Sequence, residues 1–210
     1  MGIAVMILGE SGSGKSRSFK NLDPKKVMLF KATNKPLPFR SNDWNNTETT
    51  ANTHDWKRII NGIKKAPEIG KEIIIIDDFQ YVMSEELMSR FSETGYTKFT
   101  ELAVHVREVI RAAQDSPENI RIYITWHSET DEKGFLRPKT IGKMLSEKIC
   151  VEGLFTIVLK SFRKDQLYFF QTQTSGFDVC KSPEEMFENE EIPNDLNEVD
   201  KSICEYYEIN

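Results

Sequence analysis

The chain has 210 residues and a formal net charge of −5 at pH 7, with 39% hydrophobic and 29% charged residues. This composition is typical of one globular domain with a single large core. No apolar run approaches the roughly 20 residues that cross a bilayer, and the N-terminus lacks the pattern of an export signal. The three cysteines, Cys150, Cys180 and Cys204, show no metal-ligand spacing. We therefore expect a cytoplasmic protein with reduced thiols.

The net charge is unevenly distributed. Residues 181–210 carry ten acidic side chains and two lysines, a sum of −8, so the other 180 residues sum to +3. We expect one domain over residues 1–180 and an acidic, partly helical C-terminal tail over residues 181–210. Such a tail on a mildly basic body can indicate a protein that handles nucleic acid and shields its own binding surface. A solvated amphipathic helix is the alternative, and composition alone favours it.

In chain order, apolar and β-branched runs alternate with stretches of helical spacing, which predicts an α/β fold with a mostly parallel sheet. The third apolar run, residues 72–76, is a continuous β-branched stretch typical of a central parallel strand. Polar loops are expected over residues 35–53 and 127–140. The expected strands are residues 3–8, 27–30, 72–76 and 120–126, followed by a C-terminal β-hairpin of residues 154–160 and 166–173. The expected helices are one opening at Gly14, then residues 54–65, 80–91, 99–115 and 141–150, and one in the tail.

The segment after the first expected strand matches the P-loop pattern G-x-x-x-x-G-K-[ST] at every required position. Its glycines allow successive N–H groups to face an anion, and the expected helix adds its positive end. Lys15 would contact the β and γ phosphates of a nucleotide, and the Ser16 hydroxyl would enter the coordination shell of Mg²⁺. The residues predicted to bind the nucleotide are Gly9, Glu10, Ser11, Gly12, Ser13, Gly14, Lys15 and Ser16.

Two further strands end in residues suited to the same chemistry. Asp77 follows the third strand and would hold Mg²⁺ together with Ser16. Asp78 would polarise the attacking water, although it could instead cap the next helix. His127 follows the fourth strand, where it would contact the γ-phosphate or the water; a purely structural role at the strand end remains open. The predicted catalytic residues are therefore Lys15, Asp78 and His127.

Adenine is favoured over guanine because the chain lacks a guanine motif. The nearest match, residues 34–37, has Leu37 where Asn-Lys-x-Asp requires aspartate. We therefore expect ATP and Mg²⁺ as cofactors. Arg90, Arg107 and Arg111 give weak support for the arginine-rich lid of a nucleotide or small-molecule kinase, which is retained as an alternative.

The P-loop, the acid after the third strand and the His after the fourth resemble the RecA-family core ATPases. More closely, the chain resembles the short phage ATPases of this core that are identified as Sak-type single-strand annealing proteins. The runs 93–100, 139–145, 152–159 and 181–183 carry this likeness. It implies the strand order 5-1-4-3-2 and an ATP-hydrolysing DNA recombination protein in the host cytoplasm. It also implies a homo-oligomeric ring or filament, and the acidic tail could recruit a single-strand-binding protein.

The same resemblance implies two DNA-binding loops, because basic side chains beside an aromatic ring suit single-stranded DNA. An ordinary solvated loop is the alternative. The family's glutamate after the second strand is absent, so either Asp78 substitutes for it or hydrolysis is slow and ATP serves as an assembly switch. A non-hydrolysing replication accessory therefore also remains open. The implied DNA contacts are Arg90, Tyr96 and Lys98 in the first loop and Lys133, Phe135, Arg137 and Lys139 in the second; Lys139 and Lys143 would reach a neighbouring subunit's γ-phosphate.

Overall fold

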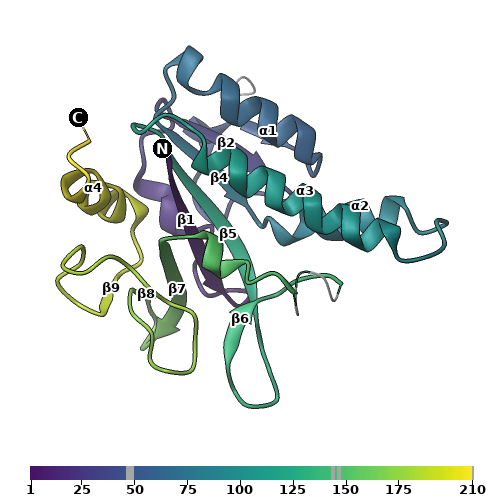
Figure 1. Cartoon of the computed structure of the whole chain (residues 1–210). Coiled ribbons are helices and arrows are strands. Elements are labelled where there is room, and N and C mark those ends of the chain that lie inside the picture. Colours follow the sequence, from purple (N-terminus) through teal and green to yellow (C-terminus); the bar gives the residue numbers. More distant parts are fainter. Residues whose placement is uncertain (46–49, 143–144, 146–147, 210) are drawn as a thin grey trace.

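The computed structural model describes residues 1–45, 50–142, 145 and 148–209. Within them the chain forms a mixed α/β fold built on a nine-stranded sheet (Figure 1). The strands are β1 Ile3–Gly9, β2 Val27–Lys31, β3 Thr50–Asn52, β4 Ile73–Asp77, β5 Arg121–Thr130, β6 Leu136–Pro138, β7 Ile157–Lys164, β8 Leu167–Gln171 and β9 Glu191–Pro193. The helices are α1 Trp56–Lys65, α2 Gln80–Ser89, α3 Thr97–Gln114 and α4 Leu196–Tyr206, with short 3-10 helices η1 Ser18–Asn21, η2 Asn42–Trp44, η3 Pro67–Ile69 and η5 Glu152–Leu154.

The sheet is mostly parallel and its order is β3-β2-β4-β5-β1-β7-β8-β9, with β6 paired to β5. The expected order 5-1-4-3-2 is wrong as a description of this sheet because it contains too few strands. The five strands of the expected order correspond to β1, β2, β4, β5 and β7 and lie together as β2-β4-β5-β1-β7, with the second strand of the predicted hairpin as β8 beside β7. The added edge strands were missed because β3 and β9 are three residues long and lack an apolar run, and Pro193 suits only an edge position.

The sheet is covered on both faces. Successive side chains of a strand point to opposite faces, so the continuously apolar central strands must be buried on both sides. In β1, Met6 and Leu8 face one hydrophobic cluster, whereas Val5 and Ile7 face the other. The first cluster includes buried residues of α1, α2 and α3, and the second includes buried residues of η1, η2 and α4. No helix among the described residues is long and apolar enough to cross a membrane.

The helix expected to open at Gly14 does not form as an α-helix. The P-loop motif, residues 9–16, is called the phosphate loop below. It is followed by turns and by the four-residue 3-10 helix η1. Pro24 disfavours helical backbone at the residue before it, and so leaves room for only one or two turns after the loop. The Ser18 hydroxyl also donates to the carbonyl of Lys15 at 2.5 Å, and such bonds compete with regular helix hydrogen bonding.

Two segments expected to be polar loops contain strands. Residues 127–140 form an antiparallel β5–β6 hairpin, because the Asp131 carboxylate accepts from the amides of Lys133 and Phe135 and closes a turn. Gly134 has a φ of 82° in that turn, which a residue with a side chain adopts only at a cost. Within residues 35–53, η2 and β3 form. Four residues of the helix expected over residues 141–150, namely 143, 144, 146 and 147, lie outside the described residues.

The C-terminal β-hairpin is confirmed as β7 and β8. Its two-residue turn is at Asp165 and Gln166, whose φ angles of 49° and 66° suit a type I′ turn. The acidic residues 181–210 also pack on the domain. They supply β9 to the sheet, and α4 buries Leu196, Val199 and Ile203 against the second cluster.

Candidate nucleotide-phosphate site

The carboxyl ends of three parallel strands meet at one edge of the sheet. Gly9, the last residue of β1, is in register with His127 of β5, and Asp77 is the last residue of β4. Ligands of open α/β sheets bind at this edge. A cleft of about 330 Å³ lies there, and its lining residues are Ser11, Gly12, Gly14, Lys15, Ser16, Arg17, Lys35, Pro36, Pro38, Asp78, His127 and Tyr168.

The phosphate loop has a backbone that only glycine can adopt without strain at two positions. Gly12 and Gly14 have φ angles of 78° and 104°. At Gly14 space is also limiting, because a Cβ there would lie 2.6 Å from Cδ1 of Tyr168. The loop is held from behind by the Ser161 hydroxyl, which donates to the carbonyl of Ser13 at 2.8 Å.

The Lys15 ammonium is buried inside the loop, with 5% of the residue exposed. It donates to the carbonyls of Gly9 and Glu10, each at 2.8 Å. Burial lowers the pKa of Lys15 to about 8, and the carboxylates of Asp78 and Asp77 only partly offset this effect. The protein groups around the ammonium therefore compensate its burial only in part, and phosphate oxygens would supply further negative charge.

Asp77 lies beside the loop and is held by two hydroxyls. Ser16 Oγ and Thr125 Oγ1 donate to Asp77 Oδ1 at 2.9 and 2.8 Å. Burial and the neighbouring Asp78 raise the pKa of Asp77 to about 6 despite these hydrogen bonds. A hydroxyl and a carboxylate in contact are hard oxygen donors of the kind that Mg²⁺ prefers, so the residues present fit this cation.

Asp78 follows in a left-handed backbone conformation, with a φ of 60°. Its amide donates to Thr125 Oγ1 at 2.7 Å, which fixes the turn after β4. Its carboxylate contacts Lys35 Nζ at 2.5 Å and His127 Nε2 at 3.2 Å. Burial acts to raise the pKa of Asp78, but hydrogen bonds from His127 and Lys35 outweigh it and bring that pKa to about 2. Within the part of the chain that the structure describes, no side-chain hydrogen bond caps the N-terminus of α2, so the capping alternative for Asp78 is not realised.

Sequence reasoning missed several residues of this site, among them Arg17, Pro36 and Pro38 of the cleft lining and three whose contacts shape the site. Lys35 comes from the loop after β2, Thr125 from β5 and Tyr168 from β8. Thr125 could have been noticed as a polar residue within the apolar run of β5. Lys35 and Tyr168 carry no such signal, because their place depends on how a loop and an antiparallel strand pack beside β1.

The residues expected to contact DNA lie in two separate regions, the α2–α3 connection and the β5–β6 hairpin (Figure 1). Arg90 is paired with the carboxylates of Glu86, Glu93 and Glu101. Lys98 Nζ donates to the carbonyl of Glu93 at 2.6 Å, whereas Tyr96 is 87% exposed.

In the β5–β6 hairpin, Lys133 and Lys139 are exposed and Phe135 is half-buried. Arg137 contacts Glu129 at 3.2 Å. The Lys139 amide donates to the carbonyl of His127 at 2.8 Å, so the end of the hairpin is bonded to the phosphate site. Lys143 lies outside the described residues.

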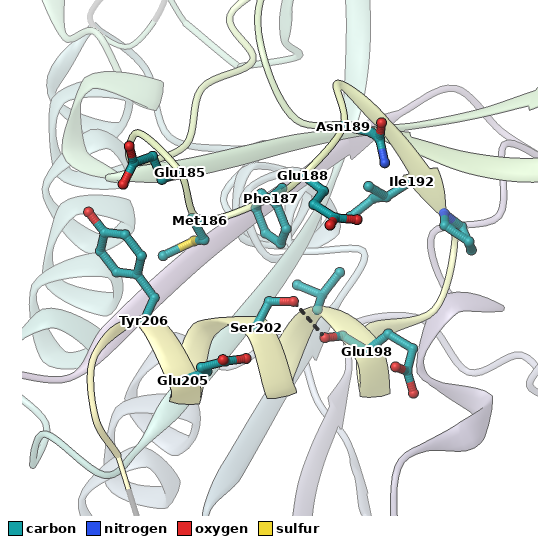
Figure 2. Close-up of a pocket in the computed structure, with 12 residues that line it drawn as sticks. Glu185, Met186, Phe187, Glu188, Asn189, Ile192, Glu198, Ser202, Glu205 and Tyr206 are labelled. Atoms are coloured by element: carbon teal, nitrogen blue, oxygen red, sulfur yellow. Dashed lines mark hydrogen bonds between the residues drawn. The ribbon is translucent and has the colours of Figure 1, made fainter.

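A larger hollow of about 650 Å³ lies between α4 and residues 185–193 (Figure 2). Its lining shares no residue with the phosphate cleft and includes Glu185, Glu188, Glu198 and Glu205. These carboxylates would repel a nucleotide phosphate, so we assign the phosphate site to the smaller cleft.

No protein-family model and no curated protein matches the chain. Among solved structures, it is similar to a KaiC-like protein of the hyperthermophilic archaeon Pyrococcus horikoshii, with 11% identity and a TM-score of 0.42. The match covers 80% of this chain and 77% of the other. The assignment of the phosphate site therefore depends on the chain's own motif and geometry.

Proposed function

We propose that the chain binds ATP with Mg²⁺ and hydrolyses it slowly. The observation that carries this proposal is the contact of Ser16, at the end of the P-loop, with Asp77 at the end of β4. In P-loop NTPases a serine or threonine and an acid at the end of a neighbouring strand hold the metal. Hard oxygen donors beside a buried lysine favour a Mg²⁺-bound triphosphate over other anions.

Each side chain has a distinct part in the reaction. Lys15 exchanges its two loop carbonyls for phosphate oxygens, which lowers the energy of its buried ammonium. When bound, Mg²⁺ would supply positive charge against the β- and γ-phosphate oxygens. Asp78 is ionised at neutral pH and accepts a hydrogen bond from the attacking water, while His127 orients the Asp78 carboxylate. A carboxylate of such low pKa is a weak proton acceptor, which supports slow turnover.

We further propose that the protein binds single-stranded DNA and promotes strand annealing, as a homo-oligomer in which ATP sets the assembly state. The β5–β6 hairpin supports this role, because it presents Lys133 and Lys139 with Phe135 nearby. The hydrogen bond from Lys139 to His127 offers a path by which nucleotide state could alter the hairpin. Arg90 contributes less, because three carboxylates already neutralise it. In this proposal Lys139 and Lys143 are the candidates to reach a neighbouring subunit.

The kinase alternative has less support. Arg107 and Arg111 belong to α3, and neither lines the phosphate cleft. The low pKa of Asp78 keeps a non-hydrolysing, ATP-locked accessory as the second candidate.

The test is ATP hydrolysis by the purified protein with Mg²⁺, with and without single-stranded DNA. We expect slow turnover that DNA stimulates and that falls at least tenfold in Asp78→Asn, with ATP binding retained. Lys15→Ala is the control and should lose binding. A hydrolysis rate that single-stranded DNA does not change would reject the recombination role. A wild type that binds ATP without hydrolysing it would favour the non-hydrolysing accessory.

A further inference from the structure

Residues 181–210, the acidic C-terminal segment, contact the phosphate loop through two consecutive buried hydrogen bonds. Asn194 lies between β9 and α4 and is 3% exposed. Its Nδ2 donates to Ser161 Oγ at 3.0 Å, and Ser161 Oγ donates in turn to the carbonyl of Ser13 at 2.8 Å. Ser161 is 2% exposed, so water does not compete with either bond.

The neighbouring backbone reinforces this contact. The Asn194 amide donates to the carbonyl of Tyr168 at 3.1 Å, and Tyr168 packs against Gly14 of the loop. The Asn194 carbonyl accepts from Arg17 at 3.5 Å, one residue after the P-loop motif. Asp195, which caps α4, accepts from Asn21 at the end of η1. The start of α4 therefore contacts the loop, the strand beside it and the short helix that follows it.

Two polar atoms in this arrangement lack a hydrogen-bond partner among the described residues, Asn194 Oδ1 and Ser13 Oγ. Asn194 Oδ1 would lie 3.2 Å from a Cβ on Gly14, so it lies directly against the loop. A buried polar atom without a hydrogen bond lowers the stability of the folded protein. Such atoms are therefore expected mainly at functional sites, where folding stability is not the sole requirement. Two such atoms beside the phosphate loop indicate that the contact serves the loop.

We propose that Asn194, acting through Ser161, is a positioning residue for the phosphate loop, so that the acidic C-terminal segment controls nucleotide binding. This inference depends on the proposed ATP site. The loop has no long helix behind it to fix its backbone, since η1 has only four residues. The Asn194–Ser161 bonds supply that support from the other side. Because coupling between two sites is reciprocal, a bound nucleotide also strengthens the docking of α4.

The test compares Asn194→Ala and Ser161→Ala with Asn197→Ala as the matched control. Asn197 belongs to the same segment, but its side-chain amide donates to Glu198 on α4 itself. Binding of ATP with Mg²⁺ is measured by calorimetry, and amide hydrogen exchange of residues 9–18 is measured on the nucleotide-free proteins. We expect about tenfold weaker ATP binding and faster exchange of the loop in both variants, and no change in Asn197→Ala. The double variant should bind ATP no more weakly than either single variant, because each single substitution already breaks the same series of hydrogen bonds from Asn194 to Ser13.

Unchanged loop exchange in folded Asn194→Ala and Ser161→Ala would overturn the proposal. So would an equal change in Asn197→Ala, because a general loosening of α4 would then be the cause. The exchange measurement needs no nucleotide, so it judges the positioning role even if the wild type binds no ATP. Failure of the wild type to bind ATP would instead reject the proposed function. Ser161→Ala removes only a hydroxyl, so it should fold and allow the test even if Asn194→Ala fails to fold.

Discussion

Replacing Lys15 by methionine should make the nucleotide-free protein more stable while abolishing ATP binding. Burial lowers the pKa of Lys15 from 10.5 to about 8. At about 1.36 kcal/mol per pKa unit, holding the ammonium in the folded protein at pH 7 costs roughly 3 kcal/mol of unfolding free energy. Methionine has a similar length without the charge, but it leaves two loop carbonyls without a donor, at about 1 kcal/mol each. The expected net gain is therefore about 1 kcal/mol.

The pH dependence separates this cause from ordinary packing effects. Between pH 8 and 10.5 the unfolded chain still binds the Lys15 proton, whereas the folded chain has released it. The unfolded state then binds more protons, so the stability of the wild type rises with pH across that window. Lys15→Met lacks this term. Urea denaturation of both nucleotide-free proteins from pH 7 to 10 should therefore show their difference shift by about 2–3 kcal/mol in favour of the wild type.

Lys20→Met is the matched control, because Lys20 is an exposed lysine on the segment just after the loop. Its stability should follow that of the wild type at every pH. A constant difference between wild type and Lys15→Met from pH 7 to 10 would refute the argument. A Lys15→Met protein less stable than the wild type at pH 7 would show that the two carbonyl hydrogen bonds outweigh the burial of the charge.

Two further changes test the rest of the site and its support. Thr125→Val removes a hydrogen bond that lowers the pKa of Asp77, so that pKa should rise above about 6. Because Mg²⁺ needs the ionised carboxylate, Mg²⁺-dependent ATP binding should fall at a higher pH in Thr125→Val than in the wild type; superimposable pH profiles would contradict this. Asp200→Asn leaves the buried Arg121 guanidinium without its carboxylate, so urea denaturation should show a loss of about 3–5 kcal/mol, largely recovered in Arg121→Met/Asp200→Leu. A loss below about 1 kcal/mol would mean that Glu72, whose Oε2 already lies 3.7 Å from Arg121 Nη2, compensates for the lost carboxylate.

The central strands and the phosphate loop were predictable because each depends on a short local pattern. The runs at β1, β4 and β5 are apolar enough to be buried on both faces, and the P-loop motif fixes its own backbone. Placing Asp77 beside Ser16 needed only one further rule, that parallel strands end at the same edge of a sheet.

The remaining features depend on contacts that no local pattern encodes. Lys35 reaches Asp78 from a proline-flanked loop, and Asn194 reaches the phosphate loop from a segment that composition presents only as acidic. The missing α-helix after the loop could have been anticipated from Pro24, because few residues separate it from Ser16. Of the three partners of Arg90, Glu86 and Glu93 could also have been anticipated from their spacing of four and three residues, whereas Glu101 could not, since it reaches Arg90 from the next helix.

The position of β1 at the centre of the sheet also affects how the chain can fold. Its neighbours are β5 and β7, so Ile3 pairs with Arg121 and Val5 with Ile157. Contacts between residues so distant in sequence form slowly, because a long loop must close before they stabilise the chain. During synthesis β1 leaves the ribosome before the other strands of this sheet, but it cannot be paired on both edges until β7 has followed. The strand that carries the phosphate loop therefore stays incompletely paired while the residues between β1 and β7 are made, and an unpaired apolar strand favours aggregation or chaperone binding.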